Sequence, residues 1–114
     1  MSKLLLSILL FFVGQTLIWY QTNGQFRWDW CAKNPFAMAL IFSIPISFAF
    51  IVATKWVVGY FDGTLWPGRF IGFATGMISF AFLTSFYMNE GINVKTAISL
   101  VLATVLVAVQ ILWK

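Results

Sequence analysis

Residues 36–54 read FAMALIFSIPISFAFIVAT, a run of 19 residues without a single Asp, Glu, Lys or Arg. A transmembrane α-helix needs about 20 consecutive, mostly apolar residues to cross the hydrocarbon core of a bilayer. Lys55 follows the run directly, and a long cationic side chain is typical of a span's end, where its charge reaches the interface. This stretch therefore predicts a membrane-spanning helix over residues 36–54.

Three further runs of the same kind flank this stretch, at residues 4–20, 70–88 and 94–113. The central turns of all four runs carry no charged side chain. We therefore expect an all-α integral membrane protein with one membrane domain over residues 1–114, in which four transmembrane helices form a compact bundle. An even number of crossings places both termini on the same side of the membrane.

The composition excludes a water-soluble fold. Of the 114 residues, 61% are hydrophobic and 9% are charged, and the mean hydropathy is +0.93. An ordinary soluble domain has about a quarter charged residues, so this chain cannot cover a water-facing surface. The seven basic residues are scattered singly, whereas a nucleic-acid interface needs a basic patch. We expect the lipid bilayer as its surroundings and no nucleic-acid partner.

The reactive side chains argue against catalysis. The sequence contains no His, one Cys at position 31, and three carboxylates at Asp29, Asp62 and Glu90. This set supplies no Cys/His metal site and no Ser-His or Cys-His nucleophile pair. The carboxylates fall in three separate polar breaks, which disfavours an acid–base pair. We expect neither an enzyme nor a bound metal or cofactor.

Basic residues at the span ends bear on orientation. Lys3, Lys55, Arg69 and Lys114 share the side of the termini on this topology, whereas Arg27, Lys33 and Lys95 lie on the other. The positive-inside rule makes the side richer in Lys and Arg cytoplasmic, so we expect cytoplasmic termini in an inner or plasma membrane. Because the count is four against three, insertion in both orientations, and hence an antiparallel dimer, is the alternative.

A glycine ladder opens the third run. Gly68, Gly72 and Gly76 are spaced four residues apart, so they share one helix face on which another backbone can approach closely. Thr75 and Ser79 lie near this face and carry hydroxyl groups for interhelical hydrogen bonds. The ladder predicts a packing surface buried in protein, either within one bundle or between two copies; we favour the first.

Proline interrupts the second run. Pro45 removes its own backbone hydrogen bond to the carbonyl of residue 41, and its ring crowds that carbonyl, so we expect a kink. Ser43 and Ser47 flank it and are candidates to satisfy the freed backbone groups. The kink is either structural or a hinge and cavity wall for transport, and structural kinks are the commoner kind.

Gln15 and Thr16 form the most polar point of the first run. Polar side chains in a membrane span usually face the bundle, where they bond between helices. With Ser43, Ser47, Thr75 and Ser79, these two residues are our candidates for a substrate cavity or for helix packing. The amide of Gln15 is the best placed of them, near the middle of its helix, either to contact a substrate or to join two helices.

The junction FYMNEGINVK at residues 86–95 resembles the drug/metabolite transporter superfamily, in particular a half-size branch with four helices. The first run, ending in Trp19-Tyr20 before a polar loop, is similar to the same branch. The resemblance implies a homodimer that transports a small molecule. Small multidrug resistance transporters, a related branch, carry a glutamate in the first helix, whereas this chain has Gln15 as its nearest polar residue.

Two other functions stay open. The absence of a charged residue inside the spans is also typical of a non-transporting subunit, which would pack against a larger membrane assembly. A channel would need rings of pore-lining residues from several copies, and Lys55 and Arg69 are placed as ordinary interfacial residues. We therefore expect a half-size transporter-like protein first, an accessory subunit second and a channel last.

Overall fold

The computed structural model describes residues 3–113, and this part of the chain is helical throughout apart from short connections. The helices are α1 (Lys3–Asn23), the 3-10 turn η1 (Gly24–Phe26), α2 (Asp29–Lys33), α3 (Pro35–Tyr60), α4 (Trp66–Met88) and α5 (Val94–Leu112). Four of them, α1, α3, α4 and α5, are long and apolar enough to cross a membrane. The all-helical fold and the four long apolar helices expected from the sequence are thus confirmed.

Three of these helices extend beyond the predicted spans, and α1 does so by ending at Asn23. Helix α3 continues past Lys55 to Tyr60, and α4 begins at Trp66 with Pro67 in its first turn. Proline is well tolerated there, because the first amide groups of a helix have no acceptor within it. The connection between the two helices is therefore a short turn over residues 61–65, in which Gly63 has a φ of 87°.

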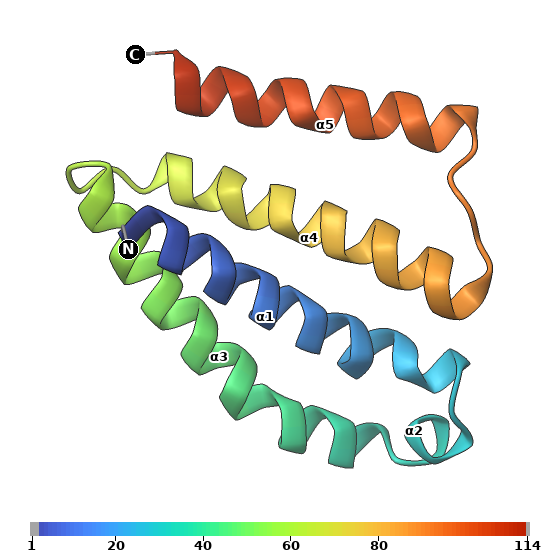
Figure 1. Cartoon of the computed structure of the whole chain (residues 1–114). Coiled ribbons are helices and arrows are strands. Elements are labelled where there is room, and N and C mark those ends of the chain that lie inside the picture. The colour runs from blue at the N-terminus through green and yellow to red at the C-terminus, as the bar shows by residue number, and fades with distance from the viewer. Residues whose placement is uncertain (1–2, 114) are drawn as a thin grey trace.

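Helix α1 lies between α3 and α4, as Figure 1 shows. Helices α1 and α4 run in the same direction, and α3 and α5 run in the opposite one. As a result α1 begins, and α5 ends, at the same end of the array, together with the turn at residues 61–65. Helix α2 and the connection at residues 89–93 lie at the opposite end.

Small residues allow α1 and α3 to approach closely. Ser7 on α1 and Ala53 on α3 are fully buried, and a Cβ atom added to Gly14 would lie 3.1 Å from the ring of Phe50. Because lipid tails are as apolar as the helix surfaces, helices in a membrane associate through this kind of close packing. The tight α1–α3 contact and the α4 residues that join it form the core.

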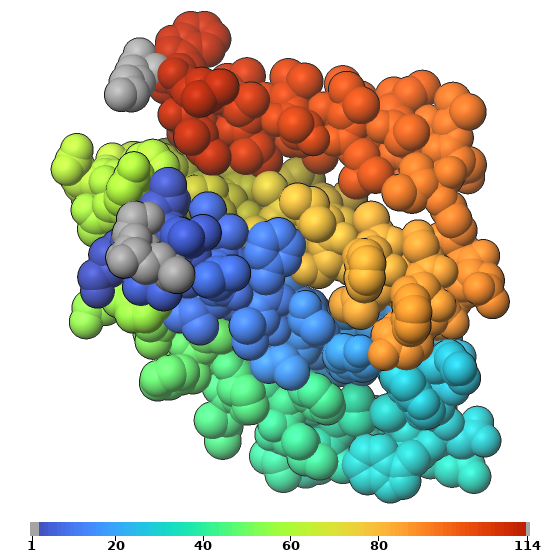
Figure 2. Space-filling view, viewed as in Figure 1, coloured from blue at the N-terminus to red at the C-terminus, as the bar shows by residue number. Residues whose placement is uncertain are grey.

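Helix α5 departs from the expected compact bundle. None of its residues is buried, and it lies along α4 at the edge of the molecule. Ile111, near its C-terminal end, packs against the core, whereas Figure 2 shows gaps along its length beside α4. The structure is therefore a three-helix unit of α1, α3 and α4 with α5 attached to one side.

The α1–α3 packing predicts that a larger side chain at position 53 strongly lowers the stability of the protein. Ala53→Phe should destabilise the protein by about 1–3 kcal/mol, because the site has no room for a larger side chain. Ala39→Phe makes the same change at an exposed position of the same helix and should be nearly neutral. Thermal unfolding of the detergent-solubilised protein, followed by near-ultraviolet circular dichroism, measures both. Equal midpoints for the two variants would contradict this packing.

Candidate functional site

A groove of about 940 Å³ lies beside α1, α3 and α4. Its walls are mainly aromatic and aliphatic side chains, with Gln15 and Thr54 as polar groups and Arg69 as the charged one. Residues of α4 from Trp66 to Phe80 contribute most of the lining. The groove therefore follows the seam between α1 and α4, starting at the end of the molecule where α4 begins.

A second hollow, of about 300 Å³, continues this groove. Four residues line both spaces: Gln15, Ile18, Gly76 and Phe80. The second hollow then extends to Thr22 and Asn23, at the last turn of α1. The two spaces together follow the α1–α4 seam from Trp66, at the start of α4, to Asn23, at the end of α1, and Gln15 lies where they meet.

Gln15 is held in place by the glycine ladder. Its Nε2 atom donates a hydrogen bond of 2.9 Å to the carbonyl oxygen of Gly72, which also accepts a 2.9 Å bond from the hydroxyl group of Thr75. A Cβ atom added to Gly76 would lie 2.9 Å from the Cδ atom of Gln15. Gly76 therefore provides the space in which the amide sits, at the border of both hollows.

The other two glycines of the ladder pack within the same chain. A Cβ atom on Gly68 would lie 2.6 Å from Val57 of α3, and one on Gly72 would lie 3.5 Å from Phe11 of α1. The ladder thus faces α1 and α3, which is the intramolecular alternative that we favoured. Dimerisation through this face would require the three-helix unit to come apart.

The remaining predicted residues divide into two groups. Thr75 and Ser79 are buried on α4, 3% and 7% exposed, and so join the same helix face as the ladder. Thr16 is partly exposed and lines neither of the two hollows. The fold thus brings together Gln15, the glycine ladder and the hydroxyl groups of Thr75 and Ser79, and it leaves Thr16 outside this group.

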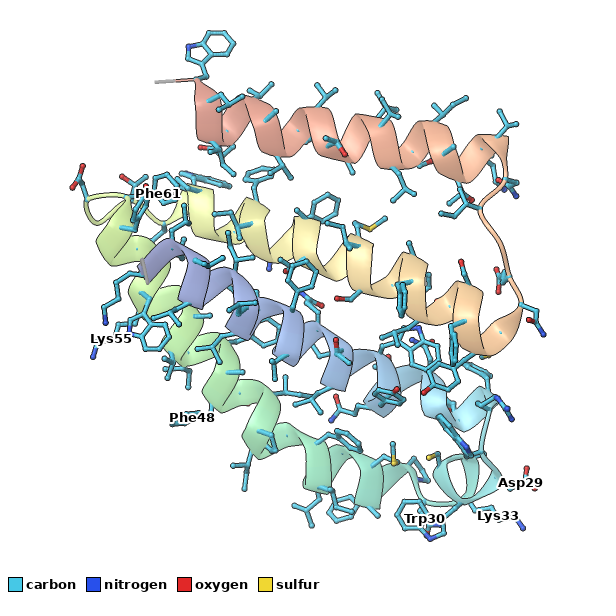
Figure 3. All side chains as sticks on the ribbon, in the orientation of Figure 1. Asp29, Trp30, Lys33, Phe48, Lys55 and Phe61 are labelled. Atoms are coloured by element: carbon cyan, nitrogen blue, oxygen red, sulfur yellow. The ribbon has the colours of Figure 1, made fainter. Side chains whose placement is uncertain are left out.

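Pro45 and its two serines lie away from the groove. All three are exposed on α3, which remains one continuous helix and bends in its middle (Figure 1). The hydroxyl group of Ser43 donates to the carbonyl oxygen of Ala39, one turn earlier, and not to the carbonyl of residue 41 that proline frees. Phe48, one turn after Pro45, points outward in Figure 3. This face is therefore not a wall of the groove.

Aromatic residues join α1 to α4 near the end of the seam opposite to Arg69. The indole Nε1 of Trp19 donates 2.9 Å to the hydroxyl oxygen of Thr84, and the hydroxyl groups of Tyr20 and Tyr87 are 2.7 Å apart. Trp28 packs edge-on against Tyr87 with 5.5 Å between ring centroids. No local pattern in the sequence predicts these pairs, because their members are 59 or more positions apart.

The described residues hold no evident centre for metal chemistry. Within residues 3–113, no group of three or more His, Cys, Asp or Glu residues lies together in a way that could hold a metal ion. No protein-family model matches the chain, and neither a curated protein nor a solved structure is significantly similar to it. Any function must therefore be argued from the groove itself.

The contact between Gln15 and Gly76 predicts that substitutions at these two positions have non-additive effects on stability. Gly76→Ala should lower stability by about 1–3 kcal/mol, because its new methyl group displaces the amide. In the double variant with Gln15→Ala the loss should be smaller than the sum of the two single losses, since the obstruction is removed. Gly59→Ala is the matched control, because nothing lies within 4 Å of its added Cβ atom. Additive losses in chemical unfolding would show that the two residues do not touch.

Proposed function

We propose that this chain is a half-size, drug/metabolite-transporter-like membrane protein, which acts as a homodimer and moves a small molecule along the α1–α4 seam. The observation that carries the proposal is the pair of connected hollows, which follow the seam from the start of α4 to the end of α1 with Gln15 where they meet. In this proposal α1, α3, α4 and α5 all cross the membrane.

The position of Gln15 supports a binding role in addition to packing. An amide in the hydrocarbon core is costly unless its polar atoms have partners. One hydrogen bond to Gly72 serves its Nε2 group, and the side chain borders both hollows. A molecule moving along the seam would therefore meet a polar group about halfway. Because this group is an amide, binding a cation through an embedded carboxylate is not part of the proposal.

The exposed apolar surface of α5 supports a dimer. Its outer face presents Ile98, Leu102, Val105 and Val109, all about half exposed or more and spaced at i, i+4, i+7 and i+11. The groove is also open on one side, so a single copy does not enclose a path. A second copy packed on α5 would supply both a partner for this helix and part of an enclosure.

The same arrangement of helices bears on which side of the membrane holds the two termini. If all four long helices cross the membrane, α1 begins and α5 ends on one side, which we propose to be the cytoplasmic side. Lys3, Lys55 and Arg69 lie at this end of the array, whereas Lys114 falls outside the described residues. Asp29 and Lys33 of α2 lie at the opposite end and point away from the helices (Figure 3).

An accessory subunit is the second candidate, and the same exposed α5 favours it. A helix with no buried residue can serve as the docking surface for a different membrane protein as readily as for a second copy. The two candidates differ in the use of the groove, since a subunit that only docks needs no water-accessible seam.

Water access at Gln15 tests the transport function directly. In a Cys31→Ser background, Gln15→Cys should react with a charged methanethiosulfonate reagent about tenfold faster than Val13→Cys, because thiolate forms only where water reaches it. Val13 is the matched control, as it lies two residues away on the same helix at nearly the same depth and is 51% exposed on its surface. Equal, slow labelling of both variants in membrane vesicles would overturn the transport path.

Crosslinking tests the dimer. With Cys31→Ser again as background, Val105→Cys on the outer face of α5 should form a disulfide-linked homodimer on mild oxidation. Phe48→Cys, equally apolar and exposed but on the outer face of α3 (Figure 3), should stay monomeric. Mass spectrometry of the product identifies both partners. A product joining Val105→Cys to a different protein would replace the homodimer with the accessory subunit.

A further inference from the structure

Arg69 occupies the mouth of the groove and is the one charged side chain among the described residues that line it. It lies in the first turn of α4, where the helix dipole adds to the preference for negative charge. The other cations of this end have different surroundings. The Nζ atom of Lys3 lies 4.8 Å from the ring centroid of Trp56, and Lys55 points away from the helices in Figure 3. Asp62, in the nearby turn, is exposed and is not part of the groove wall.

The groove behind Arg69 is apolar and elongated. Phe11, Phe50, Phe70 and Phe73 are among the rings that line it. Behind Arg69 its lining on α4 continues as far as Phe80, which is about 17 Å at 1.5 Å per residue. One leaflet contributes about 15 Å to the hydrocarbon core of a bilayer. The groove is therefore long enough to receive one acyl chain whose head group remains at the membrane interface.

From this juxtaposition we infer that the groove binds a single-chain amphipathic anion, namely a fatty-acid carboxylate. The carboxylate pairs with the guanidinium group of Arg69, and the acyl chain lies along the phenylalanine rings toward Gln15. Arginine suits this contact because its planar fork donates two parallel hydrogen bonds to a carboxylate. The inference rests on the proposed function, for which it names the class of substrate.

A single chain fits the site better than a diacyl lipid. The groove carries its cation at one end, so it matches one acidic head group followed by one apolar tail. The second chain of a diacyl lipid would lie outside the walls, on helix surfaces that any bilayer lipid covers. Binding through the head group of a diacyl lipid is therefore the alternative that the experiment must separate from fatty-acid binding.

Binding of radiolabelled palmitate to the protein in phosphatidylcholine nanodiscs, measured in excess of empty nanodiscs, tests the inference. Arg69→Gln should weaken binding about tenfold, as expected for the loss of a charge-assisted hydrogen bond. Arg69→Lys, which keeps the charge but lacks the planar fork, should recover only part of this loss. Lys55→Gln is the matched control, since it removes a cation from the same end without touching the groove, and it should bind like the unmodified protein.

Competition identifies the recognised chemistry. Unlabelled palmitate should displace the label, whereas palmityl alcohol, which has the same chain without the charge, should not. Nanodiscs doped with phosphatidylglycerol should leave palmitate binding unchanged; displacement by this lipid would assign the site to a diacyl head group and overturn the fatty-acid assignment. Equal binding by Arg69→Gln and Lys55→Gln would also overturn it.

Gln15→Cys labelling distinguishes the two levels of failure. If palmitate does not bind and Gln15→Cys still reacts faster than Val13→Cys, the substrate class is wrong and the transport path stands. If neither palmitate binding nor the faster labelling is found, the proposed function fails together with the inference. If palmitate binds and also slows the labelling of Gln15→Cys, the acyl chain reaches the middle of the seam as inferred.

Discussion

Close approach of helix backbones is the constraint on which the rest of this structure depends. A hydrocarbon core offers no water for backbone groups, so each span must be a helix that satisfies its own hydrogen bonds. Helices in such a medium gain little from burying more apolar surface and associate where their surfaces fit. In this chain the fit comes from small residues, with Gly14 of α1 against Phe50 of α3, and Gly68 of α4 against Val57 of α3. These contacts place α1 at the centre.

The same contacts leave the groove open. Gly72 and Gly76 bring α4 close to Phe11 and Gln15, while the larger rings at the groove wall hold the helix surfaces apart beside them. At the far end the seam is tied by polar pairs between Trp19 and Thr84, and between the two tyrosines. The hollow thus lies beside contacts at the glycines and at one end of the seam, and ligand pockets are usually preformed in this way.

The polar groups of this hollow set what it can recognise. A carboxylate within a span would favour cations, whereas the described groove lining combines one amide, one threonine and one arginine with many rings. In the proposed topology Arg69 would lie at the interface, where an ion pair keeps part of its hydration, and Gln15 would lie deeper, where a neutral amide costs less than a charge. This arrangement suits an amphipathic anion whose apolar tail lies in the groove and whose head group stays beside Arg69. It also differs from the small multidrug resistance transporters, which carry a glutamate in the first helix where this chain has Gln15 as its nearest polar residue.

The sequence by itself determined the helical class and the four apolar spans, because span length and the exclusion of charge from hydrocarbon are properties of each segment alone. It also predicted that the glycine ladder would be buried and that Gln15 would face another helix, since periodicity places a residue on a face. Only the tertiary structure decided which helix meets that face, that α5 lies outside the core, and that Pro45 is remote from the groove. Those outcomes depend on contacts between residues far apart in the chain, such as Gln15 with Gly72 and Gly76, whose fit no local pattern encodes. Arg69 shows the difference most clearly, because its sequence position predicts an interfacial residue and only the tertiary structure places it on the wall of a groove shared with rings of α1 and α3.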